Sequence, residues 1–315
     1  MIYIGLFVLS LGLTYGIRAY ANKKAIFDIP NERSSHSNPT PRGGGLAIVI
    51  VFYIGLLYFK ESIASPLFYA LLCAIPLAFI SFLDDIFTLS YKIRFFIQSV
   101  STVMALYFLD GVSSIDFILF EIHGWWVNGI AFFSIVWLTN LYNFLDGIDG
   151  YAGAEAVMVG LGLFFFFYNP LGLVIVAASL GFLLFNWHKA SIFMGDVGSA
   201  TLGFIFAVFI FHDTSDGNIL IWLVLLSLFW FDATLTLIRR LINKENITHA
   251  HKKHAYQRLV QSGWRHDEVV WLSLFFNLIF IVLLYFVEDV WTVFLVNIIS
   301  LLVIVKLIDN KKSFK

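Results

Sequence analysis

The stretch GWWVNGIAFFSIVWLTNLYNFLDGIDG, residues 124–150, contains the two features that decide the architecture of this chain. Residues 124–142 are almost entirely apolar, and a helix of that length can cross the hydrocarbon core of a bilayer. At the end of this run, polar residues recur at every third position: Asn140, Asn143, Asp146 and Asp149. On a helix this spacing places the four side chains in one polar stripe. We therefore expect a membrane helix with polar chemistry at one end.

The composition of the whole chain also indicates a membrane protein. Of its 315 residues 60% are apolar and 13% are charged, whereas about a quarter of the residues are charged in a soluble domain. The net charge of −1 gives no argument for a nucleic-acid partner. The single cysteine, Cys73, excludes an internal disulfide and a zinc site of several thiolates.

Eleven apolar stretches predict an all-α, polytopic membrane protein with about eleven transmembrane helices. They cover residues 2–20, 43–59, 66–83, 95–109, 124–142, 151–168, 171–186, 198–212, 218–238, 268–287 and 290–308. We expect residues 1–315 to form a single transmembrane catalytic domain. The first run has no Lys or Arg before Arg18, which favours a retained helix that starts outside over a cleaved signal.

With the N-terminus outside, alternation places the polar segments on one side of the membrane. These segments are residues 21–42, 84–94, 143–150, 187–197, 239–267 and 309–315. Of the 20 Lys and Arg residues, only Lys60 falls in a loop on the other side. The positive-inside rule makes the basic side cytoplasmic. We therefore predict a multi-pass protein of the inner membrane, with a cytoplasmic C-terminus and active-site loops that face the cytoplasm.

Two of these segments carry recognisable chemistry early in the chain. Residues 41–45 read PRGGG, and such a glycine-rich turn can expose backbone amides to phosphate oxygens, with Arg42 as the counter-charge. Asp84 and Asp85 end an apolar run, and Lys92 and Arg94 follow them. Adjacent carboxylates at a membrane boundary repel each other, so they usually serve a cation, a proton transfer or a basic partner. A solvated helix cap is the alternative interpretation.

Two further segments lie later in the chain. FNWHKASIFMGDVGS, residues 185–199, places Asp196 between glycines at the start of an apolar helix, where a carboxylate can hold a metal beside free amides. HAHKKHAYQRL, residues 249–259, places His251 and His254 among cations. Zinc is possible there, but the neighbouring Lys and Arg residues suit a diphosphate better. The alternative is a basic loop near anionic lipid.

The donor atoms of these segments are amide and carboxylate oxygens. Such a set suits a hard cation such as Mg2+, which keeps several waters and bridges to substrate phosphates. Mn2+ could substitute.

Taken together and in this order, the segments resemble the polyprenyl-phosphate N-acetylhexosamine-1-phosphate transferase superfamily. The resemblance is carried by PRGGG (41–45), LDD (83–85), NLYNFLDGIDG (140–150), FNWHKASIFMGDVGS (185–199) and HAHKKHAYQRL (249–259). It implies an enzyme that transfers a sugar 1-phosphate from a UDP-N-acetylhexosamine to undecaprenyl phosphate, with undecaprenyl-diphospho-sugar and UMP as products. Membrane lipid would surround it, and a homodimer is left open.

The resemblance also implies roles for individual residues. Asn143 and Asp196 are the expected Mg2+ ligands. Asp84, supported by Asp85, would engage the lipid phosphate as base or organiser, and Asp146 would be a second catalytic carboxylate. The substrate-binding residues would be Arg42, Lys92, Arg94, Asn140, Asp149, His251 and His254, with Asp149 helping to read the nucleotide.

The histidine loop departs from the three consecutive histidines typical of peptidoglycan enzymes. This favours initiation of O-antigen or another surface polysaccharide over a phospho-N-acetylmuramoyl-pentapeptide transferase. A CDP-alcohol phosphatidyltransferase is disfavoured because Asp146–Tyr151 lacks the Ala-Arg of that signature. A transporter is disfavoured because the polar clusters gather at one face. We also expect an apolar groove for the lipid chain, bounded by residues 84–94 and 143–150.

Overall fold

The computed structural model describes the chain except for residues 31–34, 36–37, 88, 247–248, 250 and 315. The helices are α1 (Ile2–Lys24), α2 (Gly45–Tyr58), the 3-10 turn η1 (Lys60–Ser62), α3 (Ser65–Leu72), α4 (Ala74–Phe87), α5 (Tyr91–Phe108), α6 (Val127–Leu145), α7 (Tyr151–Phe167), α8 (Pro170–Asn186), α9 (Asp196–His212), α10 (Asn218–Leu225), α11 (Ser227–Ile242), α12 (Ala255–Gln261), α13 (His266–Phe286) and α14 (Val290–Lys311). The strands are β1 (Phe27–Asp28), β2 (Thr40–Pro41), β3 (Ser114–Asp116) and β4 (Glu121–His123).

The predicted all-α architecture is confirmed. Each of the eleven apolar stretches corresponds to one helix or to two consecutive helices. Among the described residues, four helical segments are long and apolar enough to cross a membrane: Ile2–Lys24, Ser65–Phe87, His266–Phe286 and Val290–Lys311. The stretch predicted as one span over 218–238 is instead broken after Leu225, where α10 and α11 meet at 77°, and this pair would make a fifth.

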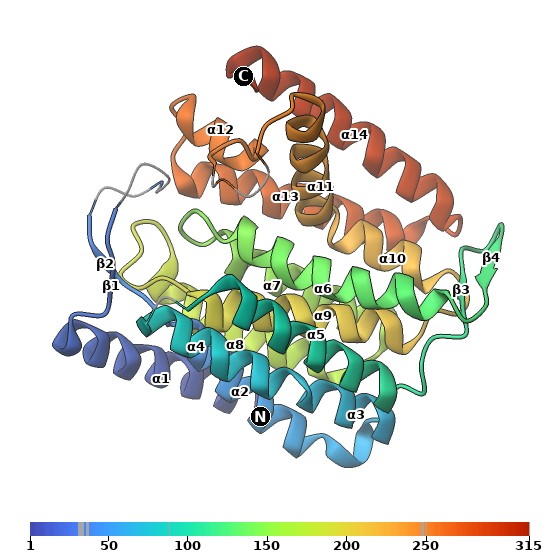
Figure 1. Cartoon of the computed structure of the whole chain (residues 1–315), viewed down its shortest axis with the longest axis horizontal. Coiled ribbons are helices and arrows are strands. Elements are labelled where there is room, and N and C mark those ends of the chain that lie inside the picture. Colours follow the sequence, from blue (N-terminus) through green and yellow to red (C-terminus); the bar gives the residue numbers. More distant parts are fainter. Residues whose placement is uncertain (31–34, 36–37, 88, 247–248, 250, 315) are drawn as a thin grey trace.

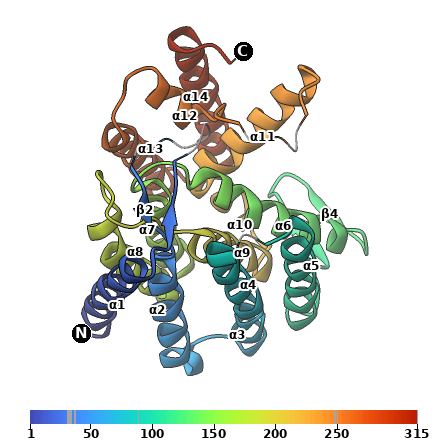
Figure 2. The ribbon, with the colours of Figure 1, turned by 60° about the vertical axis from the view of Figure 1, so that its left-hand side comes forward.

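Helix α9 lies at the centre of the bundle. It packs against α2, α4 and α6, and every residue from Val197 to Phe211 is buried. Helix α8 packs against α1, α2 and α7, so it is joined to α9 through α2 (Figures 1 and 2). Because Asp196 is the first residue of α9, the bundle places this carboxylate at the middle of one end.

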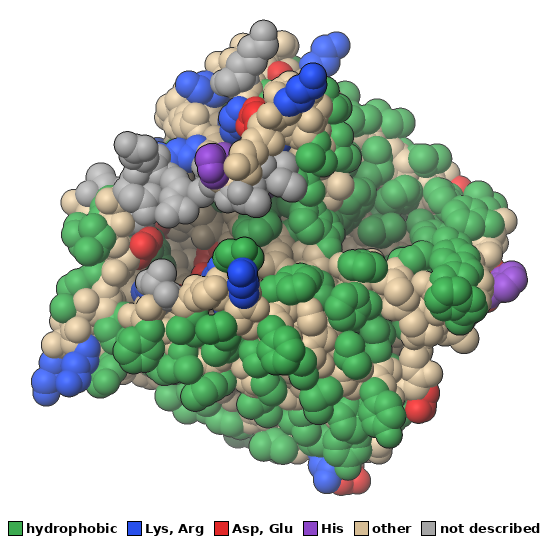
Figure 3. Space-filling view, viewed as in Figure 1, with side chains coloured by type: hydrophobic (Ala, Val, Ile, Leu, Met, Phe, Trp, Pro, Cys, Tyr) green, Lys and Arg blue, Asp and Glu red, His purple; other side chains and the backbone are tan. Residues whose placement is uncertain are grey.

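Helices α11, α12 and α14 rise above the main layer of helices (Figure 1). Helix α13 joins the two parts, since it packs against α7 on one side and against α12 and α14 on the other. The surface seen in Figure 3 is largely apolar over α1–α6, whereas charged side chains gather around α11, α12 and the loops near β1 and β2. A water-soluble protein rarely exposes so large an apolar area, so this surface fits a multi-pass membrane protein.

Candidate functional site

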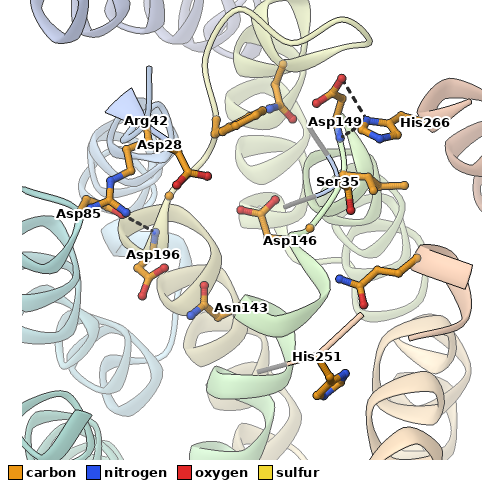
Figure 4. Close-up of a pocket in the computed structure, with 16 residues that line it drawn as sticks. Asp28, Ser35, Arg42, Asp85, Asn143, Asp146, Asp149, Asp196, His251 and His266 are labelled. Atoms are coloured by element: carbon orange, nitrogen blue, oxygen red, sulfur yellow. Dashed lines mark hydrogen bonds and ion pairs between the residues drawn. The ribbon is translucent and has the colours of Figure 1, made fainter. Parts of the chain in front are cut away.

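A polar cavity of about 360 Å³ opens at the end of the bundle where α9 begins. Its walls come from every polar segment predicted to carry chemistry (Figure 4). They are formed by Asp28, Ser35, Arg42, Asp85, Asn143, Asp146, Gly147, Ile148, Asp149, Asn186, Phe193, Gly195, Asp196, His251, Gln257 and His266. Residues more than 200 positions apart in the sequence therefore share one cavity.

The glycine-rich segment 41–45 pairs with the segment that precedes Asp196. Phe193 N donates to Pro41 O (2.8 Å), Gly44 N donates to Phe193 O (2.9 Å), and Gly45 N donates to Met194 O (2.8 Å). This pairing fixes the backbone on both sides of Arg42. Arg42 lines the cavity, and its buried Nε has no hydrogen-bond partner among the described residues. Its Nη2 donates to Asp84 O (3.4 Å), and the rest of the guanidinium can pair with an anion in the cavity.

Asp85 caps the N-terminus of α9. Its Oδ1 accepts from Asp196 N (3.0 Å) and its Oδ2 accepts from Val197 N (3.2 Å). Gly195 has φ +76°, and a Cβ there would lie 2.5 Å from Asp85 Oδ2. A side chain at this position would be strained by the left-handed backbone and would clash with the Asp85 carboxylate, so the position requires glycine. Asp85 supports the helix that presents Asp196.

Arg94 bridges two carboxylates beside the cavity. Its Nη1 donates to Asp84 Oδ2 (2.6 Å) and to Asp196 Oδ2 (2.5 Å). Asp84 Oδ1 also accepts from Leu89 N (2.5 Å). A single guanidinium thus offsets part of the repulsion between Asp84 and Asp196.

Asn143 lies next to Asp196 in Figure 4, and its Oδ1 accepts from the Ser199 hydroxyl (2.6 Å). The expected four-residue stripe is wrong in one respect, because α6 ends at Leu145. Asp146 and Asp149 lie in the turn that follows and reach the cavity from non-helical backbone. Asn140 lies one turn back, where it donates to Gln98 Oε1 (2.9 Å) outside the cavity lining.

Asp146 sits in a concentration of negative charge. Burial raises the pKa of its carboxyl to about 8, and the carboxylates of Asp196, Asp85 and Asp149 add to the effect. No hydrogen bond from a described residue reaches the Asp146 side chain. This environment favours a proton or a bound cation at Asp146 near neutral pH.

Asp149 is held at the opposite wall of the cavity. Its Oδ2 lies 2.8 Å from His188 Nδ1 and 3.2 Å from His266 Nδ1, and it accepts from Ala190 N (3.3 Å). Burial alone would raise the pKa of Asp149, but the hydrogen bonds from His266 and His188 outweigh it, so the pKa is lowered. Asp149 is therefore ionised near neutral pH, unlike Asp146.

The two predicted histidines have different positions. His251 lines the cavity, and burial, followed by the nearby His254 and Arg240, lowers its pKa to about 4. It is neutral near pH 7, and its Nδ1 accepts from Lys253 N (3.2 Å). His254 is buried outside the cavity lining, with its Nδ1 3.5 Å from Asp232 Oδ1. Asp232 also accepts from Ala255 N (2.9 Å), so it supports the start of α12.

Seven of the twelve predicted site residues line the cavity: Arg42, Asp85, Asn143, Asp146, Asp149, Asp196 and His251. The other five, Asp84, Lys92, Arg94, Asn140 and His254, lie outside its lining. Among them Arg94 contacts the cavity residue Asp196 directly, whereas Lys92 is exposed at the start of α5. Arg258, one of the cations beside the predicted histidines, instead pairs with Asp309 of α14, as does Arg239.

The sequence interpretation missed several lining residues. Asp28 reaches the cavity because β1 pairs with β2 next to Arg42. Asn186 accepts from Gly150 N (3.0 Å) and donates to Ile192 O (2.9 Å), which ties two motifs together. Asn186, and His188 beside the lining residue Asp149, belong to the segment 185–199, but the spacing did not single them out. His266 carried no sequence signal beyond its place at the start of an apolar run.

Comparison with known proteins supports the family resemblance. Glycosyl transferase family 4 matches residues 67–212. A probable undecaprenyl-phosphate N-acetylglucosaminyl 1-phosphate transferase of Bacillus subtilis is 30% identical over 87% of both chains. An undecaprenyl-phosphate alpha-N-acetylglucosaminyl 1-phosphate transferase of Thermotoga maritima is 29% identical over 86% of this chain and 87% of its own.

A phospho-N-acetylmuramoyl-pentapeptide-transferase of Prochlorococcus marinus is 30% identical over 62% of this chain and 63% of its own. The resemblance read from the motifs is thus confirmed over most of the chain. The protein is a transferase of glycosyl transferase family 4, within the polyprenyl-phosphate N-acetylhexosamine-1-phosphate transferase superfamily.

Proposed function

We propose that this protein transfers an N-acetylhexosamine 1-phosphate from a UDP-sugar to undecaprenyl phosphate, which gives undecaprenyl-diphospho-sugar and UMP. The observation that carries the proposal is the convergence of all five family motifs on one cavity at one end of the bundle. The Bacillus subtilis and Thermotoga maritima relatives are named for the same reaction with N-acetylglucosamine.

The cavity suits a divalent cation, for which Mg2+ is our proposal and Mn2+ a substitute. Asn143 and Asp196 would hold it, since both offer oxygen donors and lie next to each other (Figure 4). The raised pKa of Asp146 indicates negative charge that a dication would relieve. When bound, the cation would neutralise charge on the diphosphate of the donor.

The acceptor chemistry needs little general-base power. A phosphate monoester is mostly dianionic at pH 7, so its oxygen is already a nucleophile. The main difficulty is to bring two anions together, and positioning by charge can supply most of the catalysis. Arg42 and Arg94 are placed to offset that charge, with Lys92 nearby. Asp84 and Asp85 would organise the lipid phosphate, and Asp84 could act as a base.

We infer that the isoprenoid chain of the acceptor runs along the lipid-facing side between residues 84–94 and 143–150. Tyr91, Ile93 and Phe144 expose apolar side chains there. A second route is an apolar cavity of about 460 Å³ between α1, α2 and α4, which shares Arg42 and Asp85 with the polar cavity. Blocking the second cavity distinguishes the two routes.

The proposed topology keeps eleven spans, with α3 and α4 forming one span and α10 and α11 forming another. The N-terminus would lie outside and the C-terminus in the cytoplasm, with the cavity facing the cytoplasm. The basic residues near the cavity support this orientation through the positive-inside rule. The membrane would be the inner, cytoplasmic membrane, and cysteine labelling from either side of intact cells tests the assignment.

The product would start O-antigen or another cell-surface polysaccharide. The alternative is the phospho-N-acetylmuramoyl-pentapeptide transferase reaction, for which the Prochlorococcus marinus relative is named. The longer match to the N-acetylglucosaminyl 1-phosphate transferases favours a UDP-N-acetylhexosamine over UDP-N-acetylmuramoyl-pentapeptide as the donor.

The test is UMP release by purified protein with undecaprenyl phosphate and a panel of UDP-N-acetylsugars, with and without Mg2+. We expect metal- and lipid-dependent UMP from one donor, loss of activity in Asp196→Ala, and retention in Asp216→Asn. Asp216 is exposed in the loop between α9 and α10 and serves as the matched control. Turnover with UDP-N-acetylmuramoyl-pentapeptide alone would support the peptidoglycan reaction. Release of UMP from no donor by the folded protein would contradict both reactions.

A further inference from the structure

Three nitrogen atoms from two separate segments surround one oxygen of Asp149. His188 follows α8, Ala190 lies two residues beyond it, and His266 is the first residue of α13. All three contacts are made to Oδ2. Among the described residues, no hydrogen bond reaches Oδ1 of Asp149. Since Asp149 lines the cavity, the arrangement leaves one carboxylate oxygen for a ligand.

The cluster is well placed to fix the direction of this carboxylate. Asp149 is 7% exposed and His266 is 7% exposed, so neither side chain has room to rotate freely. The two imidazole rings lie with centroids 5.1 Å apart and flank the carboxylate (Figure 4 shows His266). His266 Nδ1 also lies 3.3 Å from Asp149 N, which places the ring against the backbone of the turn.

An ionised carboxylate can only accept hydrogen bonds. The free Oδ1 of Asp149 therefore suits an N–H or O–H group of the ligand, such as the N3–H of uracil. A carboxylate held in one orientation binds such a group more tightly than a mobile one, because less side-chain freedom is lost on binding. Cytosine has no hydrogen at N3, so the same arrangement would discriminate against a cytidine nucleotide.

We propose that His188 and His266 are positioning residues that hold Asp149 Oδ2 and thereby set the affinity and base selectivity for the nucleotide of the donor. This inference rests on the proposed function and on the expectation from the family resemblance that Asp149 helps to read the nucleotide. The same three side chains could instead bind a metal, because their ligand atoms all lie within 4.8 Å of one another. The hydrogen bond from Ala190 N to the same Oδ2 favours the positioning role, because that oxygen already accepts from the backbone.

His188 gives a sharp test because only its Nδ1 contacts Asp149. The amide nitrogen of asparagine lies close to the position of Nδ1, whereas that of glutamine lies near Nε2. We expect His188→Gln to raise the Kd for UDP and the KM for the UDP-sugar about tenfold, as expected for loss of one hydrogen bond to a charged group. His188→Asn should stay within about threefold of the wild type. The kcat and the KM for undecaprenyl phosphate should be unchanged in both.

His123→Asn and His123→Gln are the matched controls, since His123 is exposed on β4 at the far end of the molecule. The selectivity for UDP over CDP should fall in His188→Gln and should be retained in His188→Asn. His266→Asn should likewise preserve UDP binding better than His266→Gln.

Three results would overturn the inference. Equal UDP affinities for His188→Asn and His188→Gln would reduce His188 to a space-filling role. A fall in kcat with unchanged KM would place it in the chemistry instead. Stoichiometric zinc in the purified wild type that is lost from both variants would make the cluster a metal site. Separately, unchanged UDP binding in Asp149→Asn would remove Asp149 from the nucleotide site, while UMP release by the wild type would leave the proposed reaction standing.

Discussion

Gly45 and Gly198 lie with their backbones in contact, so that a Cβ on Gly45 would come within 2.4 Å of Gly198 Cα. One glycine begins α2 and the other lies in the first turn of α9. Their contact joins the glycine-rich segment that carries Arg42 to the helix that carries Asp196. Two motifs about 150 residues apart thus share one packing requirement.

Gly45→Ala should destabilise the protein because a methyl group would push against backbone, which cannot rotate away. Overpacking of this kind costs about 1–3 kcal/mol. We expect a lower unfolding temperature in detergent and weaker activity. Gly12→Ala on α1 is the control, since a Cβ there meets nothing within 4 Å. Equal unfolding temperatures for the two variants would show that the α2–α9 contact adapts easily.

Asp196→Asn should reduce UMP release by at least about 100-fold, a typical loss for removal of a group that stabilises transition-state charge. The substitution keeps the shape but removes the charge beside Arg94 and Asn143. The binding of Mg2+, measured as the rise in unfolding temperature that Mg2+ causes, should weaken in parallel. If Asp196→Asn retained both activity and Mg2+ stabilisation, Asp196 would not be a metal ligand.

The stability of the metal-free protein should fall as pH rises from about 4 to about 8. Folded Asp146, with a pKa of about 8, holds a proton that the unfolded carboxyl, with its ordinary pKa of 3.8, has already released. In this window the folded state binds more protons, so stability declines with pH. Mg2+ should stabilise the protein increasingly over the same range, because it competes with that proton.

Thermal unfolding at several pH values, with EDTA or Mg2+, measures both trends. Asp146→Asn should have a flatter metal-free profile because it lacks the titrating carboxyl. An identical pH slope in the wild type and in Asp146→Asn would assign the proton uptake to another group.

Asp309→Asn should loosen the contact between α14 and α12. Asp309 accepts two hydrogen bonds from Arg239 (2.9 and 3.0 Å) and also pairs with Arg258, whose side chain is buried. Leaving a buried donor unsatisfied costs about 1–3 kcal/mol. Asp267→Asn, which breaks a pair with the exposed Arg265, should cost less, because solvent screens that guanidinium. Denaturant unfolding compares the two, and equal losses would mean that Arg258 finds another partner.

Gly16→Leu should leave the KM for undecaprenyl phosphate unchanged. The side chain would enter the apolar cavity between α1, α2 and α4, where a Cβ on Gly16 meets nothing within 4 Å. If the lipid chain runs past Tyr91 and Phe144 instead, filling this cavity has no effect on the acceptor. Gly5→Leu is the control on the same helix. A raised acceptor KM in Gly16→Leu alone would move the chain to this cavity.

The apolar stretches and the polar motifs could be predicted from the sequence because each depends only on residues that are close together along the chain. A run of apolar residues specifies a helix in lipid whatever surrounds it, since the backbone must satisfy its own hydrogen bonds there. Spacing between residues such as Asn143 and Asp146, or the glycines around Asp196, is likewise a local property. The all-α fold, the family and the set of segments that form the site followed from this information.

The tertiary structure decided which side chains reach the cavity. Local spacing could not show that α6 ends at Leu145, that α10 and α11 bend at 77°, or that Asp309 of α14 takes Arg239 and Arg258 away from the site. It also could not bring His188 and His266 to Asp149. These relations depend on how helices far apart in the sequence pack, and packing depends on the shapes of both partners, which a linear pattern does not contain.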